Sequence, residues 1–275
     1  MIVDYHMHLR DRAEEAPGGR YRLDHLERYV ERAARAGVDE IGFTEHVYHF
    51  RQTHALWEIP WMLDRCTDDL DEYVGTVDEA RRQGLPVKLG LEVDYFPGTE
   101  AALLELLAAY EWDYLLGSVH FVDGFPVDQR PALTEKLPAA EAWRRYFVWL
   151  RNAARSGLFD ALSHPDIVKF FGVRPADGEA THFVYEETAD AVEAAGLCVE
   201  ISTKGLRVPV GELYPDPELL RAFHDRGAPI TLASDAHEPE DVGRDFDRGL
   251  ELARAAGYNT VTVFERRQRR QEPLG

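Results

Sequence analysis

The sequence of 275 residues predicts an α/β protein in which parallel strands form a closed or nearly closed β/α barrel. Short apolar runs of the β type alternate with amphipathic helical patterns, which indicates parallel strands joined by right-handed helical crossovers. About seven or eight such units follow one another, which is the number that a barrel needs. No glycine-rich phosphate loop follows the first strand, so an open doubly wound sheet is the less favoured alternative. We expect a single barrel domain over residues 1–275.

The expected strands are short runs rich in apolar and β-branched residues, and they cover residues 2–6, 40–44, 87–92, 114–118, 161–164, 198–202, 230–234 and 260–264. The expected helices have apolar residues at helical spacing, and they cover residues 24–36, 68–83, 99–109, 140–156, 181–195, 217–226 and 240–256. Asp24 is expected to cap the first helix, with Glu27 three residues further on. Most of these helices are followed by a glycine suited to a left-handed helix end, namely Gly37, Gly84, Gly157, Gly196, Gly227 and Gly257.

Composition and charge exclude several classes of protein. Apolar residues make up 45% of the chain and aromatic residues 11%, which is typical of a globular protein with a packed core. The net charge of −19 repels phosphate-rich surfaces, so we expect neither a nucleic-acid partner nor an anionic membrane. No apolar run approaches the roughly 20 residues that span a bilayer, and no signal segment precedes the first strand. Because Cys66 and Cys198 offer no disulfide framework, we expect a cytoplasmic protein.

Histidines and carboxylates gather at the carboxyl ends of the expected strands, which meet at one face of a β/α barrel. These residues are His6, His8, Glu45, His46, Glu92, His120, His164, Asp235 and His237. A single histidine at a strand end is most often a hydrogen-bonded core or loop residue, but so many on one rim predict a multinuclear site. Imidazole and carboxylate ligands suit Zn²⁺, Mn²⁺ or Fe²⁺. Glu92 is the natural bridge, because one carboxylate can hold two ions.

Six short segments, "DYHMH", "FTEH", "GLEVDY", "GSVHF", "SHPD" and "SDAH", resemble in their order the polymerase-and-histidinol-phosphatase (PHP) superfamily. The resemblance implies a distorted (β/α)7 TIM-like barrel with a trinuclear metal centre. The segments "GSVHFVDGFPVD", "HPDIVKFFG" and "STKGLRVPVGELYPDPELL" resemble its histidinol-phosphatase branch. This branch implies hydrolysis of L-histidinol phosphate in histidine biosynthesis, by attack of a metal-bound hydroxide on phosphorus.

The resemblance also implies a ligand set for two or three divalent ions. It assigns His6, His8, Glu92 and Asp235 to the first ion, Glu92, His120 and His164 to the second, and His46 and His237 to the third. Members of the family usually have a further histidine six residues after His8, where this chain has Glu14. We therefore expect the Glu14 carboxylate to replace an imidazole at the third ion, with Asp11 and Glu15 nearby.

A small phosphorylated substrate needs further contacts beside the metal ions. Arg207 matches the arginine that the family places on the phosphate, with Lys169 as the second candidate and Lys204 as the third. Each of them has the alternative of a solvated surface cation. Ser118 is a further candidate for substrate binding, at the end of its strand. The proton for the leaving alkoxide is expected to come from Asp235 or His237.

Two long loops on the expected active face, residues 47–65 and residues 121–131, are candidates for the substrate pocket or a lid. Residues 47–65 include His49, His54, Trp57 and Trp61, which line the pocket or pack the loop onto the rim. Acidic groups there, such as Glu45, Asp94 and Asp123, are expected to receive an amine-bearing substrate. Two other functions stay open: a phosphoesterase for another small ester, such as a nucleotide or sugar phosphate, and a noncatalytic PHP module that regulates a partner.

Overall fold

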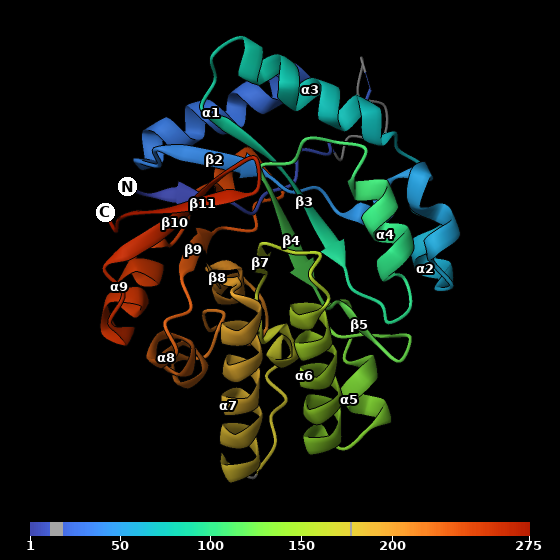
Figure 1. The fold of residues 1–275 in the computed structure, drawn as a ribbon, viewed down its shortest axis with the longest axis vertical. Helices are drawn as coiled ribbons and strands as arrows, with labels where there is room; N and C mark the ends of the chain where they lie inside the picture. Colours follow the sequence, from blue (N-terminus) through green and yellow to red (C-terminus); the bar gives the residue numbers. More distant parts are fainter. Residues whose placement is uncertain (12–18, 177) are drawn as a thin grey trace.

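A computed structural model describes residues 1–11, 19–176 and 178–275 of the chain. Its principal sheet has seven strands in the order β1-β2-β3-β4-β7-β8-β9, and every neighbouring pair is parallel (Figure 1). The strands are β1 (Val3–Asp4), β2 (Glu40–Phe43), β3 (Val87–Asp94), β4 (Tyr114–Ser118), β7 (Ala161–Leu162), β8 (Cys198–Ser202) and β9 (Ile230–Ala233). Each of them lies in a predicted strand or overlaps one.

The first and last strands of this sheet lie next to each other. The amide of Tyr5 donates to the Leu232 carbonyl at 3.0 Å, and Met7 forms a parallel bridge with Ala236. The sheet therefore closes on itself almost completely, which confirms the predicted seven-stranded barrel.

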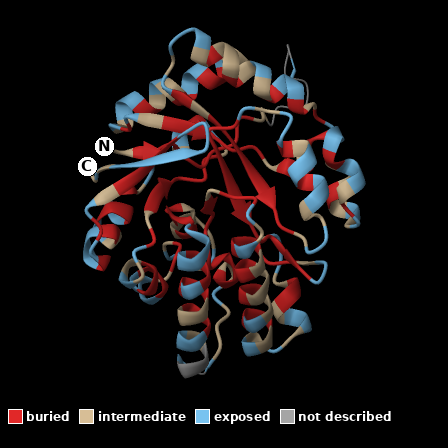
Figure 2. Cartoon of the chain, viewed as in Figure 1, coloured by how far each residue is buried: buried red, intermediate tan, exposed pale blue. Residues whose placement is uncertain are grey.

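Helices surround the barrel and bury one side against it, while their outer faces stay exposed (Figures 1 and 2). They are α1 (Leu23–Ala36), α2 (Pro60–Leu63), α3 (Leu70–Arg82), α4 (Glu100–Leu107), α5 (Ala132–Lys136), α6 (Ala139–Arg155), α7 (Gly178–Ala195), α8 (Pro217–Asp225) and α9 (Phe246–Ala256). Short 3₁₀ turns are η1 (Val47–His49), η2 (Arg51–Leu56), η3 (Ile167–Lys169), η4 (Lys204–Arg207) and η5 (Pro239–Asp241). All six predicted helix-ending glycines have positive φ. No helix in the described ranges is long and apolar enough to cross a membrane.

Two predictions about helix starts are wrong. Arg22, not Asp24, is the N-cap of α1, and the Asp24 carboxylate accepts a hydrogen bond from the Arg22 guanidinium at 2.9 Å. The last helix begins at Phe246 rather than at residue 240, because Gly243 and Asp245 have left-handed φ values of 65° and 60° that interrupt the helix. The residues before this point form η5 instead.

The predicted strand 260–264 exists but is not part of the barrel. It forms β10 (Thr260–Glu265), which pairs antiparallel with β11 (Gln268–Pro273). Arg266 and Arg267 have φ values of 49° and 60°, as the two-residue turn of a tight hairpin requires. Phe264 stacks on Tyr114 with ring centroids 5.3 Å apart, so this hairpin covers the end of the barrel with its apolar side.

The barrel interior is filled by side chains. Tyr114 reaches across it, and its hydroxyl donates to the Tyr5 carbonyl at 2.8 Å. A Cβ atom at Gly42 would lie 2.1 Å from the Tyr114 hydroxyl, and one at Gly90 would lie 2.8 Å from the same ring. These two glycines leave the space that the tyrosine occupies. The histidines and carboxylates predicted as metal ligands therefore lie above a packed core, at the carboxyl ends of the strands.

Candidate metal centre

The predicted ligands among the described residues lie at or near the carboxyl ends of barrel strands. His6 and His8 follow β1, and their segment runs beside the one that follows β9, where Asp235 lies. The His8 amide donates to the Ala236 carbonyl at 2.8 Å, and this bond fixes the two segments side by side. His164 follows β7 and has a φ of 23°, while Asp235 has a φ of 51°. Such backbone conformations are costly for residues other than glycine and concentrate at functional sites.

Glu92 in β3 lies at the centre of the cluster, and its two oxygen atoms face different imidazoles. Oε2 lies 2.6 Å from His46 Nδ1 and 3.4 Å from His6 Nε2. Oε1 lies 3.0 Å from His164 Nε2 and 3.4 Å from His120 Nε2. Each oxygen therefore faces its own pair of imidazoles. This arrangement suits a carboxylate that bridges two ions.

The structure brings together all the predicted ligands that it describes. Ligand atoms within 4.8 Å of one another form four groups, which are His6–His8–Asp235, His6–Glu92–His164, His46–Glu92–His120 and His8–His46–His237. The second and third groups share Glu92. The first group lies beside Glu92 through His6, and the fourth joins His237 to the other ligands. Glu14 lies outside the described residues. Asp11, which we expected nearby, pairs with Arg22 at 3.2 Å.

The buried polar atoms of the cluster fit metal ions. Several make no hydrogen bond of good geometry among the described residues, even where another ligand atom lies close by. They include His6 Nε2, His8 Nε2, His46 Nδ1, Glu92 Oε2 and Asp235 Oδ1. Because a buried polar atom without a partner costs free energy, so many of them in one place indicate a ligand that satisfies them together. Imidazole nitrogens and carboxylate oxygens are the donor set of Zn²⁺ and similar ions.

The charge states of three ligands, Glu92, Asp235 and His237, suit metal binding, whereas the pKa values of His6, His8 and His120 are raised because nearby carboxylates outweigh burial. Burial raises the pKa of Glu92, but the surrounding imidazoles outweigh burial and hold it well below its ordinary value. The pKa of Asp235 is also well below its ordinary value, because Lys204 and His6 outweigh burial. Burial, with His8, lowers the pKa of His237 to about 3. Ionised carboxylates and neutral imidazoles are the forms that bind a metal ion.

A second layer of carboxylates orients the imidazoles. Glu200 Oε2 lies 2.8 Å from His6 Nδ1, and Glu200 Oε1 accepts the His164 amide at 3.1 Å. Asp94 Oδ1 lies 2.9 Å from His120 Nδ1. Sequence reasoning missed Glu200, although a carboxylate inside the fully buried strand β8 was a signal for it. Such partners fix the ring orientation and tautomer of a ligating histidine.

We expect Glu200→Gln to weaken metal binding by about 10- to 100-fold, because the carboxylate behind His6 loses its charge. Titration of the metal-free protein with Zn²⁺ measures the effect. Glu193→Gln on α7 is a matched control, since that side chain is exposed. Equal affinity in the Glu200 variant and the control would contradict the role given to Glu200.

Of the three cations predicted to contact phosphate, Lys204 lies beside the metal ligands His237 and Asp235. Lys204 Nζ lies 3.1 Å from His237 Nδ1 and 3.5 Å from Asp235 Oδ1, so this lysine belongs to the cluster. Arg207 donates to the carbonyls of Thr203 and Ser234 and lies 3.5 Å from Asp245 Oδ2. Arg207 therefore supports the backbone beside the cluster.

Two other predicted substrate contacts lie in the interior. The Lys169 ammonium is fully buried, 2.8 Å from Asp166 Oδ2 and 2.8 Å from the Leu213 carbonyl. Ser118 is fully buried as well, and its hydroxyl donates to Glu92 Oε1 at 2.6 Å. Their contacts make Lys169 an internal ion-pair partner and Ser118 a support for the central carboxylate.

A cavity of about 390 Å³ opens directly over the cluster. It is lined by His8, Arg10, Glu45, His46, Tyr48, His49, Trp61, Arg65, Asp128, Gln129 and His237. His49 and Trp61 were expected there. His54 is exposed and Trp57 is buried, with its indole nitrogen donating to Thr53 at 2.9 Å, so neither is among the lining residues.

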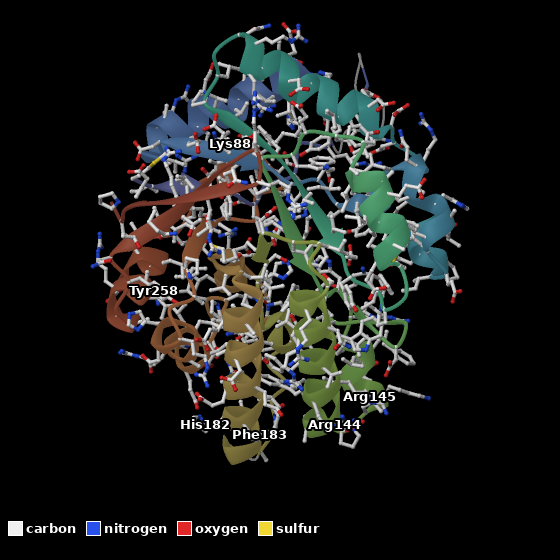
Figure 3. The ribbon with its side chains drawn as sticks, viewed as in Figure 1. Lys88, Arg144, Arg145, His182, Phe183 and Tyr258 are labelled. Atoms are coloured by element: carbon white, nitrogen blue, oxygen red, sulfur yellow. The ribbon has the colours of Figure 1, made fainter. Side chains whose placement is uncertain are left out.

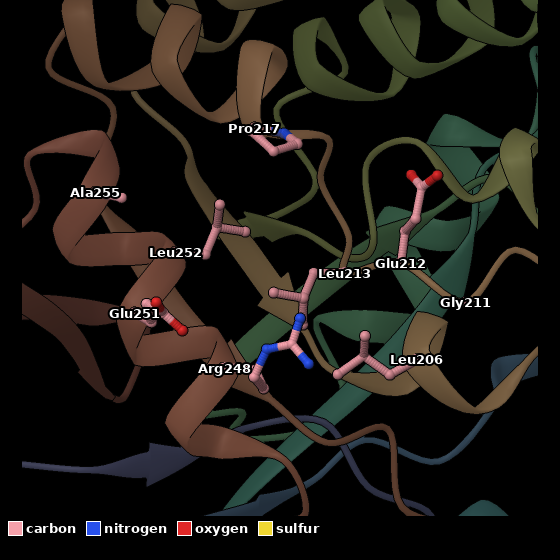
Figure 4. Close-up of a pocket in the computed structure, with 9 residues that line it drawn as sticks. All are labelled: Leu206, Gly211, Glu212, Leu213, Pro217, Arg248, Glu251, Leu252 and Ala255. Atoms are coloured by element: carbon pink, nitrogen blue, oxygen red, sulfur yellow. The ribbon is translucent and has the colours of Figure 1, made fainter.

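A second hollow lies between η4, α8 and α9 (Figure 4). Its lining residues are Leu206, Gly211, Glu212, Leu213, Pro217, Arg248, Glu251, Leu252 and Ala255. None of these is a predicted metal ligand, so the cavity over the imidazoles is the better candidate for the substrate site.

The fold and the cluster together define the class of protein: a parallel β/α barrel with a candidate metal centre of imidazoles and carboxylates at its strand ends. Comparison with known proteins identifies the family. The PHP domain matches residues 23–204, and the chain belongs to the PHP domain family.

Curated relatives and solved structures agree with this family. The chain is 36% identical to a probable histidinol-phosphatase of Deinococcus radiodurans, over 89% of this chain and 91% of the relative. It is 26% identical to the histidinol-phosphatase of Bacillus subtilis, over 83% of this chain and 92% of the relative. Its fold is similar to that of a Lactococcus lactis histidinol phosphate phosphatase solved with zinc, L-histidinol and phosphate, with a TM-score of 0.78, 21% identity and 98% of both chains covered.

Proposed function

We propose that this protein hydrolyses L-histidinol phosphate to L-histidinol and phosphate with the help of two or three divalent ions, Zn²⁺, Mn²⁺ or Fe²⁺. The observation that carries the proposal is Glu92, whose two oxygens each face a separate pair of imidazoles. The probable histidinol-phosphatase relative, 36% identical over most of both chains, supports the choice of substrate. The zinc in the Lactococcus lactis structure supports the choice of metal.

The family resemblance suggests which residues hold each ion. His6, His8, Glu92 and Asp235 would hold the first ion, Glu92, His120 and His164 the second, and His46 and His237, with Glu14, the third. The His6–His8–Asp235 group supports the first set, and Glu92 lies in two further groups, with His6 and His164 and with His46 and His120. His8 also lies within the His46–His237 group, so its imidazole stands between the first and third positions.

Bound ions of this kind neutralise phosphate charge and supply a hydroxide nucleophile near neutral pH. The residues around them would bind and orient the ester. Lys204 is a fixed cation beside His237 and Asp235, and it would stabilise charge that develops on phosphoryl oxygens held there. The predicted proton donation by Asp235 or His237 stays a prediction. The low pKa of both groups leaves them deprotonated at neutral pH, which favours the ligand role.

The test is phosphate release from a panel of phosphomonoesters, with Mn²⁺, Zn²⁺ or Fe²⁺ added to the purified protein. We expect kcat/KM for L-histidinol phosphate to exceed that for nucleotide and sugar phosphates by about 100-fold or more, since a site with groups for the amine rejects esters that lack it. Slow turnover without preference would contradict the proposed substrate. Absence of turnover with a fully loaded centre would favour the noncatalytic alternative.

A further inference from the structure

Asp128 reaches the cavity on the long loop predicted after the fourth strand, which begins as a hairpin that was not predicted. Strands β5 (Phe121–Val122) and β6 (Phe125–Pro126) follow His120, and the Val127 amide donates back to the His120 carbonyl at 3.0 Å. This bond holds the segment after β6 beside the metal centre. Asp128 is the next residue and lines the cavity together with His46 and His237.

The Asp128 carboxylate is incompletely paired. Its Oδ1 atom is buried and has no hydrogen-bond partner among the described residues. Burying an ionised oxygen without a partner is costly, so the site is best satisfied by a cation or donor that arrives with the substrate. The nearby Arg65 does not supply it, because its guanidinium lies 3.7 Å over the Trp61 ring and donates to the Trp61 carbonyl.

The three acidic residues expected to receive an amine have other partners. Glu45 accepts the Arg10 amide at 2.9 Å and lies 3.1 Å from His49 Nδ1. Asp94 is fully buried behind His120 and is not among the residues that line the cavity. Asp123 is exposed at the tip of the hairpin and pairs with Arg145 on α6 at 2.5 Å. Arg145 is labelled in Figure 3. None of them combines a cavity position with a buried oxygen that lacks a partner.

We propose that Asp128 binds the ammonium group of the substrate and thereby determines specificity for amine-bearing phosphate esters. The proposal rests on the proposed function, because an ammonium partner presupposes a substrate such as L-histidinol phosphate. The lining of the same cavity includes two aromatic side chains, Tyr48 and Trp61, whose ring centroids are 5.2 Å apart. A small molecule that carries a planar ring, an ammonium and a phosphate therefore finds a ring surface, a carboxylate and a metal centre in one cavity.

The experiment compares Asp128→Asn with wild type on two substrates, L-histidinol phosphate and its analogue without the amine, 3-(imidazol-4-yl)propyl phosphate. Loss of a charge-assisted contact is expected to lower kcat/KM for L-histidinol phosphate by about 10- to 100-fold. The loss with the amine-free analogue should be at least about ten times smaller, because that ester never makes the contact. Inhibition by L-histidinol should weaken in parallel.

Asp123→Asn is the matched control, since it changes the same residue type on the same hairpin outside the cavity, and it should lower kcat/KM for neither substrate. Metal content is measured for every variant. Equal losses of Asp128→Asn on both substrates, loss of metal from this variant, or unchanged kinetics would each overturn the proposal. If wild-type protein releases no phosphate from L-histidinol phosphate, the proposed function itself fails, and this outcome is recognised before any variant is compared.

Discussion

Replacing Glu92 with glutamine is expected to lower phosphatase activity by about 1,000-fold and to remove metal from the protein. Glutamine has nearly the shape of glutamate, but its amide has a single oxygen and no charge. The side chain could then serve the His6 and His46 side or the His120 and His164 side of the centre, but not both. The variant therefore loses the bridge between two ions. It also loses the negative charge that balances their positive charge.

Metal content per chain, measured by elemental analysis after gel filtration, checks this expectation alongside the rate. Glu105→Gln on α4 is the control, because Glu105 is exposed and lies on the outer side of the barrel. A circular dichroism spectrum like that of wild type would show that the fold is retained. Full metal content in the Glu92 variant would contradict the bridging role, whatever happens to the rate.

The order of strands and ligands could be predicted because both depend on local patterns. Alternating β and helical segments predict the barrel, and the barrel brings the carboxyl ends of its strands to one face. His6, Glu92 and Asp235 could be assigned to one centre for this reason, although they are far apart in the sequence. The hairpin that follows the predicted strand 260–264 was not predicted, because its turn depends on Arg266 and Arg267, which lack the usual glycine or asparagine signal.

What the sequence could not predict depends on which groups pair in three dimensions. Lys169 and Lys204 look alike as lysines after strands, yet one is neutralised by Asp166 in the interior and the other faces the ligands. Asp123 and Asp128 are five residues apart, and only the hairpin geometry separates an exposed ion pair from a buried oxygen without a partner. Charge pairing of this kind has no local signature in a single sequence.

Lys204→Met is expected to lower kcat/KM by about 100-fold, the usual effect of removing one fixed group that stabilises transition-state charge. Lys204 Nζ lies within 3.5 Å of both His237 and Asp235, so its charge is close to any phosphate bound to the centre. Methionine keeps most of the length and apolar surface of the side chain. Lys88→Met is the control, because Lys88 lies at the start of β3, at the amino ends of the strands, and faces Glu40 at 3.6 Å (Figure 3).

The pH dependence of metal binding separates this role from that of a ligand. Lys204 lowers the pKa of Asp235 and of His237, and removing its charge lets both pKa values rise. Protons then compete with the metal at higher pH, so the acid-side loss of metal should move to higher pH in Lys204→Met. At neutral pH and above the variant should keep its metal, because no ligand is removed. A variant of Arg207 that loses activity while Lys204→Met keeps it would restore the order expected from the sequence.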